Sequence, residues 1–91
     1  RKMRAIISVF GKDRPGIIAG LSAVLYRHGA NILDISQTVM QGAIFTMVML
    51  IEVSEGDSFS GLKADLEEAA EGLGMELHLQ REEIFDSMHR I

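Results

Sequence analysis

The residues most able to do chemistry lie in one short turn, Gly11-Lys12-Asp13-Arg14-Pro15-Gly16. An apolar strand pattern precedes the turn and an amphipathic helix pattern follows it. Pro15 suits the first turn of a helix, because its ring fixes φ and the N–H that it lacks would have no partner there. Asp13 or Arg14 then falls at the helix start, where an Asp side chain can accept a free backbone N–H. Gly11 and Gly16 allow a tight turn and the close approach of another molecule.

The chemistry that this turn predicts is the binding of a small carboxylate. The free N–H groups of a first helical turn point outward and carry partial positive charge, which favours an anion. The Gly11-Lys12 pair lacks the G-x-x-x-x-G-K-[ST] spacing of a phosphate-binding P-loop. The alternative is a plain connection between strand and helix that binds nothing.

Other chemical groupings are weak, and we expect neither a metal, nor a cofactor, nor a catalytic centre. The three histidines are far apart in sequence and there is no cysteine, whereas a metal site needs three or four convergent ligands. Ser36, His28 and Asp34 are residue types of a catalytic triad, but no nucleophile-elbow motif surrounds the serine. The acidic run from Asp65 to Glu71 is best explained as one solvated helix face.

Composition narrows the function classes further. The chain has 91 residues and a net charge of −4, with 9 Lys and Arg and no basic run. Nucleic-acid binding needs a clustered basic face, and the longest apolar run, 47–51, is far below membrane-spanning length. We therefore expect no nucleic-acid or membrane partner and a cytoplasmic location. One domain is expected over residues 3–91, with Arg1 and Lys2 as added residues or the end of a longer chain.

The hydrophobic pattern predicts the elements that position the turn. Alternating apolar residues indicate strands, and apolar residues at helical spacing indicate helices. A two-residue hairpin turn is expected at Gln41-Gly42 and an N-capping turn at residues 56–58. In chain order we expect a strand at 3–10, a helix at 15–28, strands at 31–40 and 43–53, a helix from Phe59 to Gly72 or Gly74, a strand at 75–80, and a short C-terminal helix carrying Ile84, Phe85, Met88 and Ile91.

This order predicts an α+β, ferredoxin-like βαββαβ sandwich: a four-stranded antiparallel sheet with two helices on one face. The first and third strands, the most apolar, should be central, and the mixed pattern of 31–40 suggests an edge strand. Two helices cover one face only, yet Ile6, Phe10 and one side of the third strand offer apolar residues to the other. We expect a second copy of the chain to cover that face.

Two motifs in this topology resemble a known family. The stretch Asp13-Arg14-Pro15-Gly16-Ile17-Ile18-Ala19, followed after a helix by Gly29-Ala30-Asn31-Ile32, resembles the signature of the ACT domain. The stretch 31–39, the Phe45-Thr46-Met47 strand and the ending 84–88 are similar to the stand-alone UPF0237 proteins of bacteria and archaea. The resemblance covers nearly the whole chain.

The resemblance implies a non-catalytic regulatory module that pairs with a second copy and binds a small effector, typically an amino acid, at a domain interface. Glycine and Asp positions of the first turn match the effector-binding turn, and Asn31 matches a position that often contacts the effector. Ile17 and Ile32 match apolar positions beside them. The ligand-binding residues implied are Gly11, Asp13, Pro15, Gly16, Ile17, Asn31 and Ile32.

Three other functions remain open on sequence alone. The same fold could serve as a dimeric scaffold for an unknown protein partner without any ligand. A small phosphatase of the acylphosphatase kind would need a phosphate-binding Arg in the first loop, for which Arg14 is a lone candidate. RNA binding on the sheet is opposed by the acidic balance and by the scarcity of aromatic residues.

Overall fold

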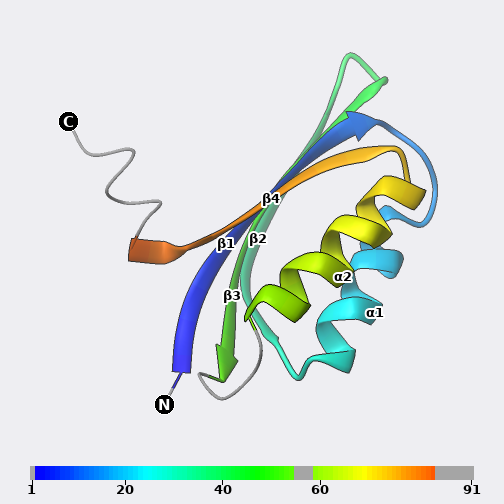
Figure 1. Ribbon diagram of the computed structural model, residues 1–91. Helices are drawn as coiled ribbons and strands as arrows, with labels where there is room; N and C mark the ends of the chain where they lie inside the picture. Colours follow the sequence, from blue (N-terminus) through cyan, green and yellow to red (C-terminus); the bar gives the residue numbers. More distant parts are fainter. Residues whose placement is uncertain (1, 55–58, 84–91) are drawn as a thin grey trace.

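The computed structural model describes residues 2–54 and 59–83, which form a four-stranded antiparallel sheet with two helices against one face (Figure 1). The strand order is β2-β3-β1-β4, so the two most apolar strands are central and the ferredoxin-like prediction is confirmed. The predicted turn at 56–58 and the predicted C-terminal stripe at 84–91 lie outside the described residues. The elements are β1 (Lys2–Lys12), α1 (Ile17–Arg27), β2 (Asn31–Met40), β3 (Ile44–Ser54), α2 (Phe59–Gly72) and β4 (Met75–Arg81).

The core lies between the sheet and the helices. β1 and β3 pair along their whole length, with Ile7 opposite Met49 and Val9 opposite Met47, and all four side chains are buried. Because side chains alternate along a strand, the odd-numbered residues of these strands face the helices. Burying one such side chain contributes roughly 1.5–3 kcal/mol. Within the described residues no charged or polar side chain is buried.

Helix α1 buries the predicted stripe and ends in a Schellman motif. Ile17, Leu21, Val24 and Leu25 are buried. Gly29 has a φ of 68°, its N–H donates to the carbonyl of Tyr26, and the N–H of Ala30 donates to that of Leu25. These two bonds satisfy carbonyls that would otherwise have no partner at the helix end.

The predicted start of α1 was wrong by two residues. The helix begins at Ile17, not at Pro15, and its N-cap is Gly16 with a φ of 85° and no side-chain cap. Pro15 therefore lies in the preceding turn, and neither Asp13 nor Arg14 caps the helix. Only glycine adopts this left-handed conformation without a steric penalty from Cβ, which is why the chain turns into the helix at this residue.

Strand β2 is an edge strand, as predicted, and all ten of its residues are exposed. Its pairing with β3 shifts at Leu33: Ile32 lies opposite Ile51, but Asp34 lies opposite Leu50. The extra residue changes which side chains face the helices, so from Asp34 onward the odd-numbered residues do. The hairpin turn follows as predicted, with positive φ at both Gln41 and Gly42.

Candidate functional site

A hollow of about 330 Å³ lies between the β1–α1 turn, the first turn of α1 and the far end of β2. Three elements meet there because the sheet register places Gly11 opposite Phe45, and Phe45 opposite Val39. The turn is tied to the β2–β3 hairpin by a hydrogen bond of 2.8 Å from the N–H of Asp13 to the carbonyl of Ala43. The residues that line this hollow, the turn pocket, are Asp13, Arg14, Gly16, Ile17, Ile18, Ala19, Gln37, Val39 and Phe45.

The turn pocket contains three of the seven site residues predicted from sequence. Asp13, Gly16 and Ile17 line it. Gly11 does not: a Cβ on this residue would come within 2.7 Å of the carbonyl oxygen of Gly74, so its small size serves the packing of the α2–β4 turn.

The other three predicted residues lie elsewhere. Pro15 lines a second hollow of about 440 Å³ on the opposite side of the turn, with Leu73 and Gly74. Asn31 and Ile32 lie at the start of β2, and Asn31 is eight residues from Val39, which is roughly 26 Å along a strand. A single chain therefore does not bring Asn31 or Ile32 to the turn.

Six lining residues were not selected from the sequence. Arg14, Ile18 and Ala19 lie within or next to the motif, and their proximity to Asp13 and Ile17 was a usable signal. The remaining three come from strands β2 and β3: Gln37, Val39 and Phe45. Only the register of β2 on β3 shows that they lie next to the β1–α1 turn.

The pocket combines polar groups at one end with apolar groups at the other. The first N–H of α1 to bond back is that of Gly20, which donates to the carbonyl of Gly16 at 2.9 Å. The N–H groups of Ile17, Ile18 and Ala19 consequently have no intrahelical partner and carry the positive end of the helix dipole. The wall opposite is apolar and formed by Val39 and Phe45.

The polar side chains of the pocket include a carboxylate and an amide. Asp13 contributes the carboxylate, and Gln37 contributes an amide with both a donor and an acceptor. Arg14 also lines the pocket, but the Nη1 of its guanidinium lies 4.0 Å from the position that a Cβ of Gly74 would take, beside the second hollow. Such a site can hold a small zwitterion with an apolar body. Among the described residues, no Ser, Thr, Cys, His, Lys or Tyr lines it, so this part of its wall provides none of the usual nucleophiles and proton carriers other than a carboxylate.

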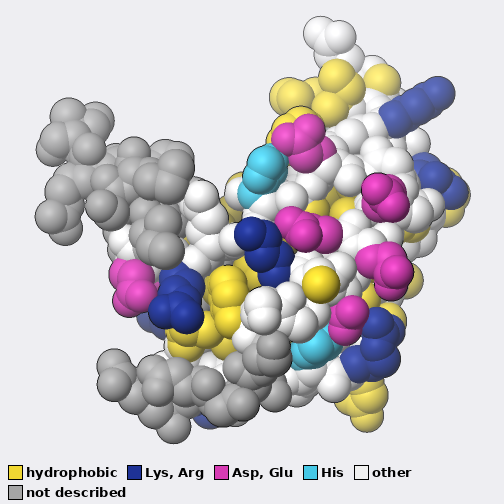
Figure 2. Space-filling view, viewed as in Figure 1, with side chains coloured by type: hydrophobic (Ala, Val, Ile, Leu, Met, Phe, Trp, Pro, Cys, Tyr) yellow, Lys and Arg dark blue, Asp and Glu magenta, His cyan; other side chains and the backbone are white. Residues whose placement is uncertain are grey.

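The second hollow is less suited to an anion. It lies against the carboxyl end of α2, where the last carbonyls carry partial negative charge. Acidic side chains also gather over α2, as Figure 2 shows. Lys12, Asp13 and Arg14 are the charged residues that line this hollow within the described part of the chain.

The described residues provide neither a metal site nor a membrane-spanning helix. Within residues 2–54 and 59–83, no group of three or more His, Cys, Asp or Glu side chains could hold a metal ion. No helix in the same ranges has the length and apolar character needed to span a bilayer.

Known proteins resemble this chain over almost its full length. Residues 4–80 match a family model described as ACT domain. A UPF0237 protein of Methanocaldococcus jannaschii is 51% identical over 89 residues, covering 97% of this chain and 98% of the relative. A UPF0237 protein of Methanopyrus kandleri is 49% identical with the same coverage.

Solved structures agree with the sequence relatives. An ACT domain protein from Streptococcus pneumoniae has a TM-score of 0.80 and 39% identity, covering 96% of this chain and 98% of that one. A putative glycine cleavage system transcriptional repressor has a TM-score of 0.77 and 26% identity, covering 88% of this chain and 46% of that one. The chain therefore belongs to the ACT domain family, and within it to the UPF0237 group.

Proposed function

We propose that residues 3–91 form one cytoplasmic, non-catalytic regulatory domain that binds a free amino acid in the turn pocket and acts as a homodimer. The observation that carries the proposal is the composition of that pocket. N–H groups of a helix start without intrahelical partners, a carboxylate, an amide and an apolar wall surround one hollow of about 330 Å³. This volume is at the lower end of the roughly 300–1,000 Å³ of small-molecule sites, which suits a ligand of amino-acid size.

Each part of an amino acid has a complementary group in the pocket. The carboxylate would accept hydrogen bonds from the N–H groups of Ile17 to Ala19. The ammonium would donate to Asp13 and to the amide oxygen of Gln37. The side chain would pack against Val39 and Phe45. Binding would then order the β1–α1 turn and the β2–β3 hairpin turn, the two segments that the Asp13 to Ala43 hydrogen bond joins.

Family membership supports the regulatory part of the proposal. A structural neighbour at 26% identity is described as a putative transcriptional repressor of the glycine cleavage system. That description concerns the neighbour, which is about twice as long as this chain. It favours control of another process by this fold over catalysis by it.

The proposal is tested by a thermal-shift screen of the whole chain against each of the twenty amino acids at about 10 mM. At a concentration of about 100 times Kd, a ligand that binds only the folded state adds about 2.7 kcal/mol of stability, which is several degrees for a domain of this size. We expect one amino acid or one chemical class to raise Tm selectively.

A matched pair of variants locates the binding. Ala19→Phe fills the turn pocket from α1, whereas Ala23→Phe adds the same ring one helical turn later, at an exposed position outside the pocket. We expect Ala19→Phe to abolish the shift and Ala23→Phe to retain it. A flat screen on the folded wild-type protein would instead favour a ligand-free scaffold, and a shift unaffected by Ala19→Phe would place the ligand elsewhere.

The predicted role of Asn31 and Ile32 is tested separately. In one chain Asn31 and Ile32 are roughly 26 Å and roughly 23 Å from Val39, so either could contact the effector only from a second copy. If a second copy supplies Asn31, Asn31→Ala should weaken the amino-acid response without changing the pocket within one chain. An unchanged response would remove Asn31 from the site and leave the turn pocket complete in itself.

A further inference from the structure

The face of the sheet that points away from the helices carries a continuous uncharged surface. Figure 1 shows both helices on the opposite face. Phe10 and Val48 are 43% and 49% exposed, which is high for apolar residues of central strands. We call this surface the open face; its uncharged members are Ile6, Ser8 and Phe10 of β1, Ile44, Thr46, Val48 and Leu50 of β3, Ser36, Thr38 and Met40 of β2, and Gln80 of β4.

Charged side chains of the same face lie at its margins and are largely paired. At one end, Lys2 lies 3.7 Å from Glu52 and Arg4 lies 3.0 Å from Glu82. Along β4, the Nε2 of His78 lies 2.7 Å from a carboxylate oxygen of Glu76. An uncharged centre within a charged margin is the arrangement typical of a protein–protein interface.

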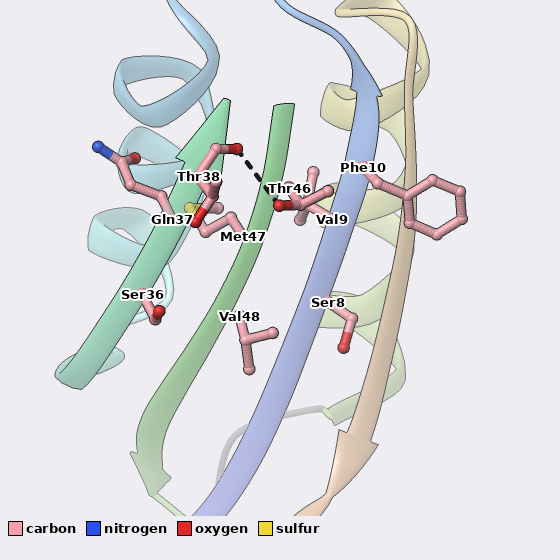
Figure 3. Close-up of a pocket in the computed structure, with 9 residues that line it drawn as sticks. All are labelled: Ser8, Val9, Phe10, Ser36, Gln37, Thr38, Thr46, Met47 and Val48. Atoms are coloured by element: carbon pink, nitrogen blue, oxygen red, sulfur yellow. Dashed lines mark hydrogen bonds between the residues drawn. The ribbon is translucent and has the colours of Figure 1, made fainter. Parts of the chain in front are cut away.

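The centre of the open face is hollowed. Figure 3 shows short side chains of three strands, among them Ser36, Thr46 and Ser8, around a depression of about 240 Å³. The hydroxyl of Thr46 donates to the carbonyl of Thr38 at 3.2 Å. Phe10 borders the depression, and its ring extends away from it and stacks on His78 with ring centroids 6.3 Å apart. The open face therefore carries a large apolar side chain directly beside a hollow lined by small ones.

A projection and a hollow on the same surface are complementary to each other when two copies meet about a two-fold axis. We propose that a second copy of this chain packs its open face against this one, with Phe10 of each copy seated in or against the hollow of the other. The two sheets would then form the layers of a sandwich about 10 Å apart. This inference names the surface through which the homodimer of the proposed function forms, and it rests on that homodimer.

The size of the open face favours a second copy over a shorter occupant. The face extends over the 11 residues of β1 and four strands, roughly 33 Å by 19 Å or about 600 Å² in projection. This is about three quarters of the roughly 800 Å² that each partner loses in a standard interface. The eight residues at 84–91 could span only about 12 Å as a helix, which is too little to cover it.

Sedimentation velocity on the whole chain, from about 1 µM to about 1 mM, tests the inference. We expect a reversible dimer whose Kd rises at least tenfold both in Phe10→Ala, which removes the projection, and in Ser36→Trp, which fills the hollow. Ile35→Lys is the matched control, because it introduces a charge on the same exposed strand but on the side of the helices. It should leave Kd within about twofold, and circular dichroism should show that all three variants are folded.

The alternative occupants give different results. Dissociation by Ile35→Lys but not by Phe10→Ala would mean pairing through the edge of β2 and would overturn the inference. A wild-type protein that stays monomeric throughout, or that dimerises only when residues 84–91 are removed, would also overturn it. The amino-acid screen tests the proposed function independently. If the protein dimerises but no amino acid raises Tm, the interface inference stands and the effector proposal fails. If the protein stays monomeric but one amino acid raises Tm selectively, only the interface inference fails.

Discussion

Glycine at position 11 is required by its neighbours rather than by its backbone. An added Cβ would come within 2.7 Å of the carbonyl oxygen of Gly74 and 2.9 Å of the terminal carbon of Met75. Gly16 shows the opposite situation, since nothing lies within 4 Å of its missing Cβ but its φ is 85°. The two glycines of the turn thus have different functions: one allows β1 to pass the α2–β4 turn closely, and the other turns the chain into α1.

Alanine substitutions at Gly11 and at Gly72 should have opposite effects on the free energy of unfolding. Gly11→Ala should lower the free energy of unfolding by about 1–3 kcal/mol, because the carbonyl that it meets belongs to the backbone and cannot rotate away. Gly72→Ala has open space and no positive φ, so it should raise the free energy of unfolding by about 0.4–1 kcal/mol. Urea unfolding at constant m-value measures both, and equal effects would contradict this account.

At the residue level, the sequence predicted the turn better than its details. Residues 13–17 could be selected because Gly and Pro punctuate the pattern and because an Asp and an Arg lie between them. The helix start was misplaced, because the handedness of Gly16 has no signature that distinguishes it from a glycine with negative φ. The contribution of Gln37 was not predictable from local sequence, since a polar residue on an edge strand is ordinary.

At the scale of elements, a polar side-chain contact connects helices α1 and α2. The Nε2 of His28, the C-cap of α1, lies 2.7 Å from a carboxylate oxygen of Asp65 on α2. The side chains are 20% and 46% exposed, so the contact is only partly shielded from water. Asp65 thus does more than solvate its helix, in contrast to the expectation for the acidic run.

A double-mutant cycle of His28→Ala and Asp65→Ala should give a coupling energy of about 0.5–1 kcal/mol, since solvent weakens a half-exposed pair. The pair His78 and Glu76 is the control. It has the same 2.7 Å separation, but both side chains are 58% exposed. Its coupling should be smaller, and a larger value there than at His28 would show that burial does not determine the strength of these pairs.

The elements themselves followed from periodicity. The strand alternation of 43–53 and the helical stripe of Leu21, Val24 and Leu25 were sufficient because each has one chemically distinct face. The site was only partly predictable, because Asn31 resembles a family contact position but lies at the far end of β2. Distance along a strand depends on register, and the shift at Leu33 has no local sequence signal.

At the scale of the whole molecule, the turn pocket and the depression on the open face lie on opposite sides of the β2–β3 pair. Gln37 contributes to the lining of both. An amino acid that alters the end of β2 would change the surface offered to the second copy. The proposed effector and the proposed dimer should therefore be thermodynamically linked.

The linkage is measured by repeating the sedimentation series with the amino acid that gives the largest thermal shift. If that amino acid changes the dimer Kd tenfold at saturation, the coupling over the two sites of the dimer is about 1.4 kcal/mol, so the affinity of each site must differ about threefold between dimer and monomer. An amino acid that gives no shift serves as the control. A dimer Kd unchanged at saturation would show that the two hollows are independent despite their shared strand.

The irregularity at Leu33 has a consequence for the tolerance of this arrangement to change. β2 is fixed at both ends, by the Schellman motif at Ala30 and by the hairpin turn after Met40, yet its ten residues lie opposite only nine residues of β3. Leu33 is the residue without a place in the pairing. Deleting Leu33 would leave the turn pocket and the depression on the open face unchanged, because the hairpin turn fixes the register of 34–40. Ile32 would then directly precede Asp34 and keep Ile51 as its partner, so β2 would pair with β3 without a register shift while the rest of the protein kept its shape.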